Sequence, residues 1–170
     1  MQSASEPQHN VPIEEYASVD DLEINAGIVV SNYYSQIAER LLTGCLDVLK
    51  PRPTVSYEVF RVMGTWEVPV VAKSLVETNR IGGIIALGCV IRGDTSHYDY
   101  ICQETSRALM NIAMEFTIPV GFGILTVDTF EQALDRSGLG KKKTESNKGA
   151  EAALAVIQSA YSIAGIRQES

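Results

Sequence analysis

Residues 92–97, Arg-Gly-Asp-Thr-Ser-His, combine the residue types needed to bind an anion and to move a proton. Gly93 lets the backbone approach a ligand closely, and N–H groups at a helix start, helped by a Thr or Ser hydroxyl, bind phosphate well. His97 follows, and histidine readily exchanges protons near neutral pH. The stretch predicts a phosphate site beside a proton-transfer group. The alternative is that the residues between Gly93 and His97 only cap a helix and that His97 is a surface or packing residue.

Aromatic and acidic side chains elsewhere could complete such a site. Tyr33 and Trp66 supply flat apolar faces that suit a planar heterocycle. Phe122 is also aromatic, but its position inside an apolar run favours the protein core. Glu67 stands between Trp66 and the apolar Val68, where a solvated surface role explains it poorly. Its carboxylate could accept hydrogen bonds from sugar hydroxyls or ring N–H groups.

Two cations flank an irregular segment, residues 137–147. Arg136 precedes it and Lys148 follows it, and either could bring positive charge to a bound phosphate. The alternative is that they are ordinary cations at helix ends. The run Lys141–Lys143 inside the segment fits a solvated turn.

Apolar runs that suit strands alternate with segments of helical spacing, and this pattern must position the site. It predicts an α/β fold of the three-layer, flavodoxin-like kind, with a four-stranded parallel sheet flanked by helices. Ligands bind beyond the carboxyl ends of such strands, and residues 92–97 follow the third one. Strands are predicted at 26–30, 55–62, 84–87 and 120–125, and helices at 34–50, 68–79, 97–118, 129–136 and 148–163.

The charge is unevenly distributed over the 170 residues, whose net charge is −7. Residues 1–24 hold six acidic residues and no Lys or Arg, which predicts an arm that is flexible or docked on a neighbour; residues 25–170 form a single domain. The acidic balance argues against nucleic acid as a partner.

The sequence also excludes several other classes. The longest apolar run, residues 81–91, is too short for a membrane span, which needs about 20 residues. The three cysteines show no metal-ligand spacing, and the N-terminus lacks a secretory pattern, so we expect reduced thiols, no metal and a cytoplasmic location. Motifs for ATP (GxxxxGK(S/T)), for NAD (GxGxxG) and for a serine nucleophile (GxSxG) are absent. A response regulator would need a phosphoacceptor Asp ending the third strand, which we expect to end at Gly88.

Three segments closely resemble the 6,7-dimethyl-8-ribityllumazine synthase family: residues 86–100 (ALGCVIRGDTSHYDY), 121–126 (GFGILT) and 147–153 (NKGAEAA). The resemblance implies the penultimate step of riboflavin biosynthesis, in which 5-amino-6-(D-ribitylamino)uracil condenses with 3,4-dihydroxy-2-butanone 4-phosphate and releases phosphate and water. It implies neither a metal nor an organic cofactor.

The resemblance also implies a role for each site residue. His97 is implied to be catalytic. The phosphate is implied to lie on Gly93, Asp94, Thr95 and Arg136. The pyrimidine and its ribityl chain are implied to meet Tyr33, Thr65, Trp66, Glu67, Cys89, Val90 and Ile91, with Phe122 and Lys148 coming from a neighbouring subunit's side.

Departures from the family pattern bear on affinity and assembly. Met63 stands where Pro is common, Trp66 where Phe is common, and Tyr34 where Asn is common. The segment between Arg136 and Lys148 is about four residues longer than in shell-forming members, which predicts a homopentamer over a sixty-subunit capsid. The resemblance further suggests that the arm adds a strand to a neighbour's sheet, and that riboflavin synthase is a partner. A second hypothesis is a non-catalytic assembly that binds flavin or lumazine.

Overall fold

Strands and helices alternate along the chain, as the apolar pattern predicts. The computed structural model describes residues 22–139 and 147–168. The predicted acidic arm therefore lies outside the described residues except for its last three. The elements are β1 (Ile24–Ser31), α1 (Ser35–Leu49), β2 (Val55–Val62), the 3₁₀ turn η2 (Thr65–Glu67), α2 (Val68–Glu77), β3 (Gly83–Ile91), α3 (His97–Phe116), β4 (Val120–Val127), α4 (Phe130–Leu134), the π-type turn η3 (Asp135–Leu139) and α5 (Lys148–Gln168).

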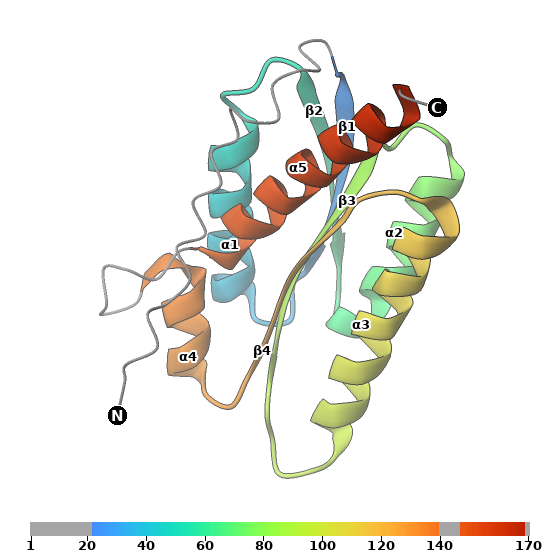
Figure 1. Cartoon of the computed structure of the whole chain (residues 1–170). Coiled ribbons are helices and arrows are strands. Elements are labelled where there is room, and N and C mark those ends of the chain that lie inside the picture. Colours follow the sequence, from blue (N-terminus) through green and yellow to red (C-terminus); the bar gives the residue numbers. More distant parts are fainter. Residues whose placement is uncertain (1–21, 140–146, 169–170) are drawn as a thin grey trace, which may run out of the picture.

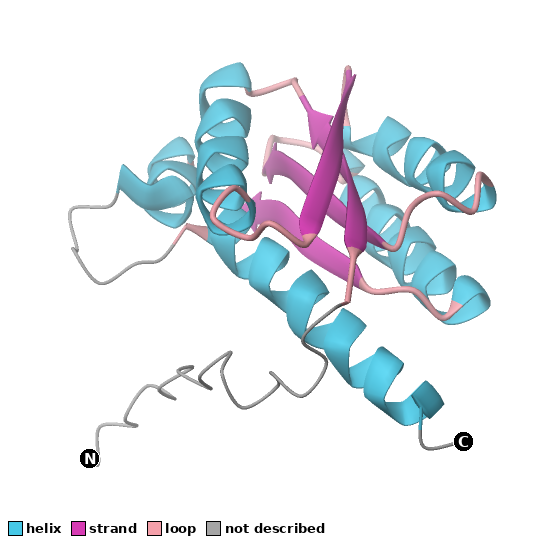
Figure 2. Cartoon of the chain, turned by 90° about the horizontal axis from the view of Figure 1, so that it is seen from above, coloured by secondary structure: helices cyan, strands magenta, loops and turns pink. Residues whose placement is uncertain are grey.

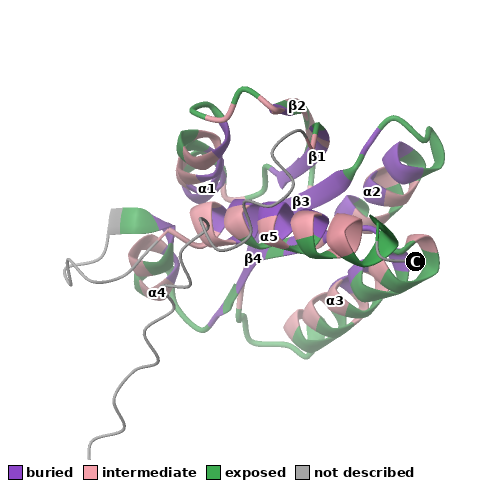
Figure 3. Ribbon diagram, turned by 45° about the horizontal axis from the view of Figure 1, so that its top comes forward, coloured by how far each residue is buried: buried purple, intermediate pink, exposed green. Residues whose placement is uncertain are grey.

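The four strands form one parallel sheet in the order β2-β1-β3-β4. Helices α1 and α5 pack on one face of the sheet, and α2 and α3 pack on the other, which gives three layers (Figures 1 and 2). The central strands β1 and β3 are buried almost throughout, and exposed residues concentrate on loops and outer helix faces (Figure 3). The predicted flavodoxin-like α/β fold is confirmed.

Helix α1 follows from a single apolar stripe. Ile37, Leu41, Cys45 and Leu49 recur at helical spacing and are at most 1% exposed. The helix ends at Leu49, and Lys50 still has helical backbone as its C-cap, but Pro51 follows and has no backbone N–H to continue the helical hydrogen bonds.

The third strand is longer than predicted. The apolar pattern places its end at Gly88, but β3 continues to Ile91 because it stays paired with β4 as far as Ile91 opposite Val127. Gly88 is a strand residue that leaves room for a neighbour: a Cβ atom there would lie 3.0 Å from the Cβ of Ser31. Glycine therefore reflects close packing at this position, not the end of the strand.

Helix α5 approaches its neighbours closely because its inner face carries glycine and alanine. A Cβ atom on Gly149 would lie 2.0 Å from the carbonyl oxygen of Leu41 in α1, and one on Gly121 of β4 would lie 2.3 Å from the carbonyl of Ala152. Among the described residues, α5 is the one helix that by length and composition could cross a membrane. Its face around Ala153 and Ile157, however, is buried in the core.

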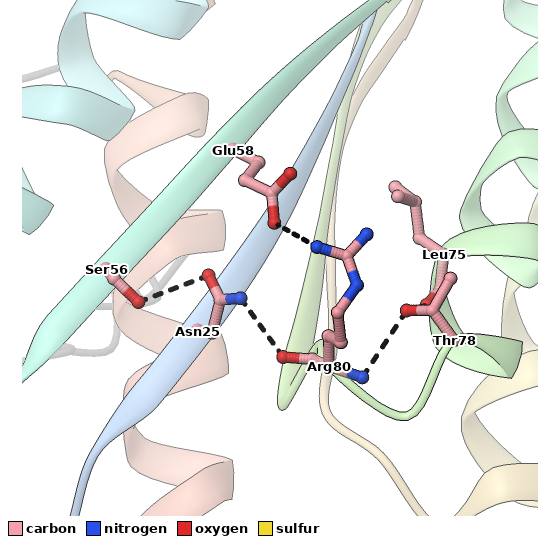
Figure 4. A network of polar contacts seen from close by, with 6 residues as sticks. All are labelled: Asn25, Ser56, Glu58, Leu75, Thr78 and Arg80. Atoms are coloured by element: carbon pink, nitrogen blue, oxygen red, sulfur yellow. Dashed lines mark hydrogen bonds and ion pairs between the residues drawn. The ribbon is translucent and has the colours of Figure 1, made fainter.

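A polar network ties the amino edge of the sheet together (Figure 4). The Asn25 amide of β1 donates to the carbonyl of Arg80 at 3.0 Å and accepts from the Ser56 hydroxyl of β2 at 3.2 Å. The Arg80 guanidinium reaches the Glu58 carboxylate at 3.4 Å. This network fixes the turn between α2 and β3 at the end of the sheet opposite to the predicted site.

Candidate active site

The carboxyl ends of the parallel strands bring distant segments to one edge of the sheet. Residues 32–34 follow β1, residues 63–67 follow β2, and residues 92–96 lie between β3 and α3. Because β2, β1 and β3 are neighbours in the sheet, Tyr33, Trp66 and His97 gather at the same edge. The described residues there show no group of three His, Cys, Asp or Glu side chains arranged as metal ligands.

The loop before α3 is open, and its side chains do little to cap the helix. Residues 92–97 are all exposed, and a Cβ atom on Gly93 would meet nothing within 4 Å. Ser96 has helical backbone (φ −68°, ψ −1°), and its side chain makes no capping hydrogen bond. Thr95 Oγ1 makes only a long contact, accepting from the His97 N–H at 3.4 Å. This geometry weakens the helix-cap interpretation and leaves a helix start that is able to bind an anion.

Arg92 anchors this loop to two neighbouring elements. Its guanidinium pairs with Asp99 of α3 at 3.0 Å and with Asp128 beyond β4 at 3.1 Å, and its Cζ lies 4.1 Å from the centre of the Tyr98 ring. Desolvation lowers the pKa of Arg92, but hydrogen bonds to Asp99 and Asp128, together with charge interactions with Asp99 and Tyr98, leave this pKa raised. No role was predicted for Tyr98 or Asp99, although both lie in the segment 86–100 that resembles the family and in the first turn after the predicted loop.

Asp128 and Thr129 both precede α4, and either type of side chain can cap a helix. Thr129 does so, because its Oγ1 accepts from the Gln132 N–H at 3.2 Å. The Asp128 backbone N–H donates to the Gln132 side chain at 2.8 Å, which leaves the Asp128 carboxylate for Arg92. This choice between a helix cap and an ion pair depends on the distance between β3 and β4.

The expected pyrimidine-facing aromatics are exposed at the edge. Tyr33 is 71% exposed and Trp66 is 56% exposed, so both present ring surface to a ligand. Tyr33 meets Tyr34 edge to face, with ring centroids 5.1 Å apart. Desolvation, with smaller contributions from Tyr33 and Cys89, raises the pKa of the Tyr34 hydroxyl, which therefore stays protonated.

The two residues expected beside the ribityl chain have structural partners. Thr65 is buried, and its hydroxyl donates to Ser31 Oγ at 3.3 Å. Glu67 is exposed, but its Oε2 accepts from the Gly64 N–H at 2.9 Å and closes the turn that carries Trp66. The Glu67 carboxylate therefore shapes the loop and keeps oxygen lone pairs available for a ligand.

The end of β3 brings three of the residues expected to border the pyrimidine to the carboxyl end of the sheet. Cys89 is buried, and burial raises its pKa to about 12, so its thiol is neutral near pH 7. Val90 and Ile91 are half-buried at the carboxyl end of the strand. Side chains alternate along the strand, so Cys89 and Ile91 face the layer of α1 and α5, and Val90 faces the layer of α2 and α3.

Phe122 is 46% exposed, so the expectation that it belongs to the core is wrong. It lies on the edge strand β4, where the sheet provides a neighbour on one side only. It lines an open cavity of about 440 Å³ between α3 and β4, together with Asp99, Cys102, Gln103, Ser106 and Thr126.

The two predicted cations follow β4 in sequence. Arg136 is exposed, and its Nη1 donates to the Gln132 carbonyl at 3.3 Å, beyond α4. Lys148 begins α5, and its ammonium lies 2.6 Å from Glu151. Because α5 packs on the face of the sheet opposite to α3, the chain does not bring Lys148 to its own 92–97 loop.

The fold and the site together define a class: an α/β protein whose open helix start and exposed aromatic faces at the carboxyl ends of a parallel sheet suit a phosphate and a flat heterocycle. The model of one family, 6,7-dimethyl-8-ribityllumazine synthase, matches residues 23–163. The chain belongs to this family. It is an enzyme of riboflavin biosynthesis, a transferase that makes the ribityllumazine from the aminouracil and the butanone phosphate. Family members assemble into oligomers with active sites at subunit interfaces.

Proposed function

We propose that this enzyme binds the butanone phosphate at the start of α3, with Gly93, Asp94 and Thr95 around the phosphate and His97 beside the reacting carbons. The main support for this proposal is that α3 begins at His97, directly after an exposed loop whose Ser96 side chain makes no capping hydrogen bond. The N–H groups at the start of a 20-residue helix carry partial positive charge, which stabilises a phosphate dianion.

The chemistry needs protons moved close to that phosphate. The 5-amino group of the uracil attacks the ketone and loses water to give an imine. Phosphate then leaves by elimination, and the resulting enol tautomerises to a ketone. The ribityl-bearing nitrogen attacks this carbonyl and loses a second water, which closes the ring. His97, as the first residue of α3, is the histidine that the chain places directly beside this loop. A positioned general acid or base contributes about 10²- to 10⁴-fold in rate, and holding two substrates together supplies a further large factor.

We assign the pyrimidine to the exposed faces of Tyr33 and Trp66, with Cys89, Val90 and Ile91 bordering it. Thr65 and Glu67 would meet the ribityl chain from the turn that Glu67 closes. Arg136 would add a full positive charge to the phosphate. The Arg92 charge is already paired with two carboxylates, which supports a role in holding the loop rather than in binding the phosphate directly.

We further propose that the site is completed by a neighbouring copy. Phe122 exposes nearly half of its surface on an edge strand, and Lys148 lies on the face opposite to α3, so both are available to an adjacent subunit. The long segment between Arg136 and Lys148 supports a homopentamer over a sixty-subunit shell. The reduced cysteines support a cytoplasmic location, and riboflavin synthase, which consumes the product, is the proposed partner.

The test of the catalytic role compares two histidine variants in an assay of product absorbance with both substrates. His97→Ala should lower kcat by about 10²- to 10⁴-fold. Binding should persist, as measured by quenching of Trp66, the single tryptophan. His9, the other histidine, lies outside the described residues, and His9→Ala should leave kcat unchanged. A near-wild-type rate for His97→Ala would remove this residue from the mechanism. Tight riboflavin binding without turnover by the wild-type protein would favour the non-catalytic hypothesis.

The assembly is tested by light scattering of the wild-type protein. A homopentamer has about five times the 18.5 kDa mass of one chain. A particle near sixty chains would contradict the inference from the segment length.

A further inference from the structure

The residue directly before α5 uses its side chain to its full hydrogen-bonding capacity. The Asn147 amide donates to the carbonyls of Arg40 and Ser137, both at 2.9 Å. Its Oδ1 accepts from the N–H groups of Gly149 at 2.8 Å and Ala150 at 3.3 Å. A side-chain amide has two N–H donors and two acceptor lone pairs, so all four are occupied.

These bonds join three segments that are distant in sequence: the middle of α1, the turn η3 and the start of α5. The fit is close on both sides. A Cβ atom on Gly44 of α1 would lie 2.3 Å from the Asn147 Cγ. Ser137, whose carbonyl accepts from Asn147, is 2% exposed and held in turn by its own hydroxyl, which donates to the Leu134 carbonyl at 3.0 Å.

Asn147 and its partner Ser137 are each next in sequence to one of the two cations of the proposed site. Ser137 follows Arg136, and Asn147 precedes Lys148. One side chain therefore fixes both ends of the segment between the cations, whatever the segment's length. We infer that Asn147 is a positioning residue that sets the spacing of Arg136 and Lys148 and thereby the affinity for the phosphate-bearing substrate. This inference rests on the proposed function, in which those cations belong to the site.

An Asp variant distinguishes the clamp, by which we mean the Asn147 bonds to the Arg40 and Ser137 carbonyls, from an ordinary helix cap. Asn147→Asp keeps both acceptor contacts with the start of α5, where a carboxylate is well tolerated. It replaces the N–H donors with an oxygen that faces two carbonyl oxygens, so the contacts with α1 and η3 are lost. Asn147→Ser, whose shorter side chain still caps a helix, serves if the Asp variant does not fold.

The matched control is Asn25, which also bridges separate segments through its amide, at the amino edge of the sheet (Figure 4). Asn25→Asp removes the same kind of donor bond, to the Arg80 carbonyl, far from the proposed site. It reports the effect of lost stability alone.

The experiment measures kcat, the KM of each substrate, and competitive inhibition by inorganic phosphate in the assembled enzyme. Asn147→Asp should raise the KM of the butanone phosphate and the phosphate inhibition constant about tenfold. This is the change in affinity expected when the binding free energy falls by about the contribution of one hydrogen bond. The KM of the aminouracil should rise less than that of the butanone phosphate, because only Lys148 of the two cations is assigned to the aminouracil. Asn25→Asp should lower Tm without moving either phosphate parameter. Unchanged phosphate parameters in a folded Asn147→Asp protein, or an equal change in Asn25→Asp, would overturn the inference.

Arg136→Ala separates this inference from the proposed function. If Arg136→Ala leaves phosphate inhibition unchanged, the proposed role of Arg136 is wrong. The clamp is then judged by amide hydrogen exchange over residues 135–139. Faster exchange there in Asn147→Asp than in Asn25→Asp supports it, and equal exchange refutes it.

Discussion

Adding one methyl group at Gly149 should displace the start of α5 and impair catalysis. The Cβ atom of Gly149→Ala would lie 2.0 Å from the Leu41 carbonyl oxygen, whereas Cβ contacts under 3.0 Å are essentially never seen. Backbone has no flexible end that can move aside, so α1 and α5 must separate by about 1 Å. Lys148, the residue before Gly149, moves with the helix.

The size of the effect follows from two opposing contributions. Overpacking costs about 1–3 kcal/mol, while replacing glycine in a helix recovers about 0.5–1 kcal/mol. Gly165 lies in the same helix, and nothing lies within 4 Å of an added Cβ atom there. Gly165→Ala therefore has the stabilisation from replacing glycine without the cost of overpacking. The two variants should differ by about 1–3 kcal/mol, which corresponds to roughly 2–12 °C in Tm for a domain of this size. A displacement of about 1 Å can lower kcat/KM by about 10²-fold.

Thermal unfolding and the activity assay on both variants test this reasoning. Gly149→Ala should melt below Gly165→Ala and lose most of its kcat/KM, whereas Gly165→Ala should match the wild-type rate. If Gly149→Ala equals Gly165→Ala in both Tm and rate, the contact between α1 and α5 does not govern the site.

Arg92→Ala should raise the KM of the butanone phosphate because the 92–96 loop loses its ion pairs with Asp99 and Asp128. Arg92→Lys should recover only part of the affinity, since an ammonium cannot bind two carboxylates with the planar geometry of a guanidinium. Full recovery of the affinity by Arg92→Lys would contradict the anchoring role. Burial raises the pKa of the Cys45 thiol from 9.0 to about 12. The folded state therefore keeps a proton that the unfolded thiol loses above pH 9, so stability should fall as pH rises from 9 toward 12, by about 2 kcal/mol near pH 10.5. Urea unfolding of Cys45→Ala should show a smaller loss over that range, and an equal loss would contradict this assignment.

Periodicity was sufficient to predict most of the fold. The stripe from Ile37 to Leu49 can be buried by a helix alone, and the structure has that helix. Strand β2 has the predicted bounds, Val55–Val62. The end of β3 was predicted wrongly because Gly88 looks like a loop residue, whereas its lack of a side chain serves the packing of Ser31. That reason depends on a neighbouring strand, which no local pattern contains.

The candidate site divides in the same way. The 92–97 stretch was predicted from residue types because a glycine, hydroxyls and a histidine follow a predicted strand and precede a predicted helix, where anions bind. Arg92, Asp99 and Asp128 were missed as a unit because ion pairs between exposed residues far apart in sequence leave no periodic signal. Asn147 was missed for the same reason: its partner Arg40 lies 107 positions away.

The sequence by itself determined the alternation of elements, the parallel sheet and the edge at which ligands bind, because burial of apolar side chains repeats with the period of each element. Tertiary structure alone decided which side chains are committed to other contacts. It exposed Phe122 on an edge strand, closed the Trp66 turn through Glu67, and placed Lys148 on the face opposite to α3. Those outcomes depend on distances between elements, and such distances arise only when the layers pack.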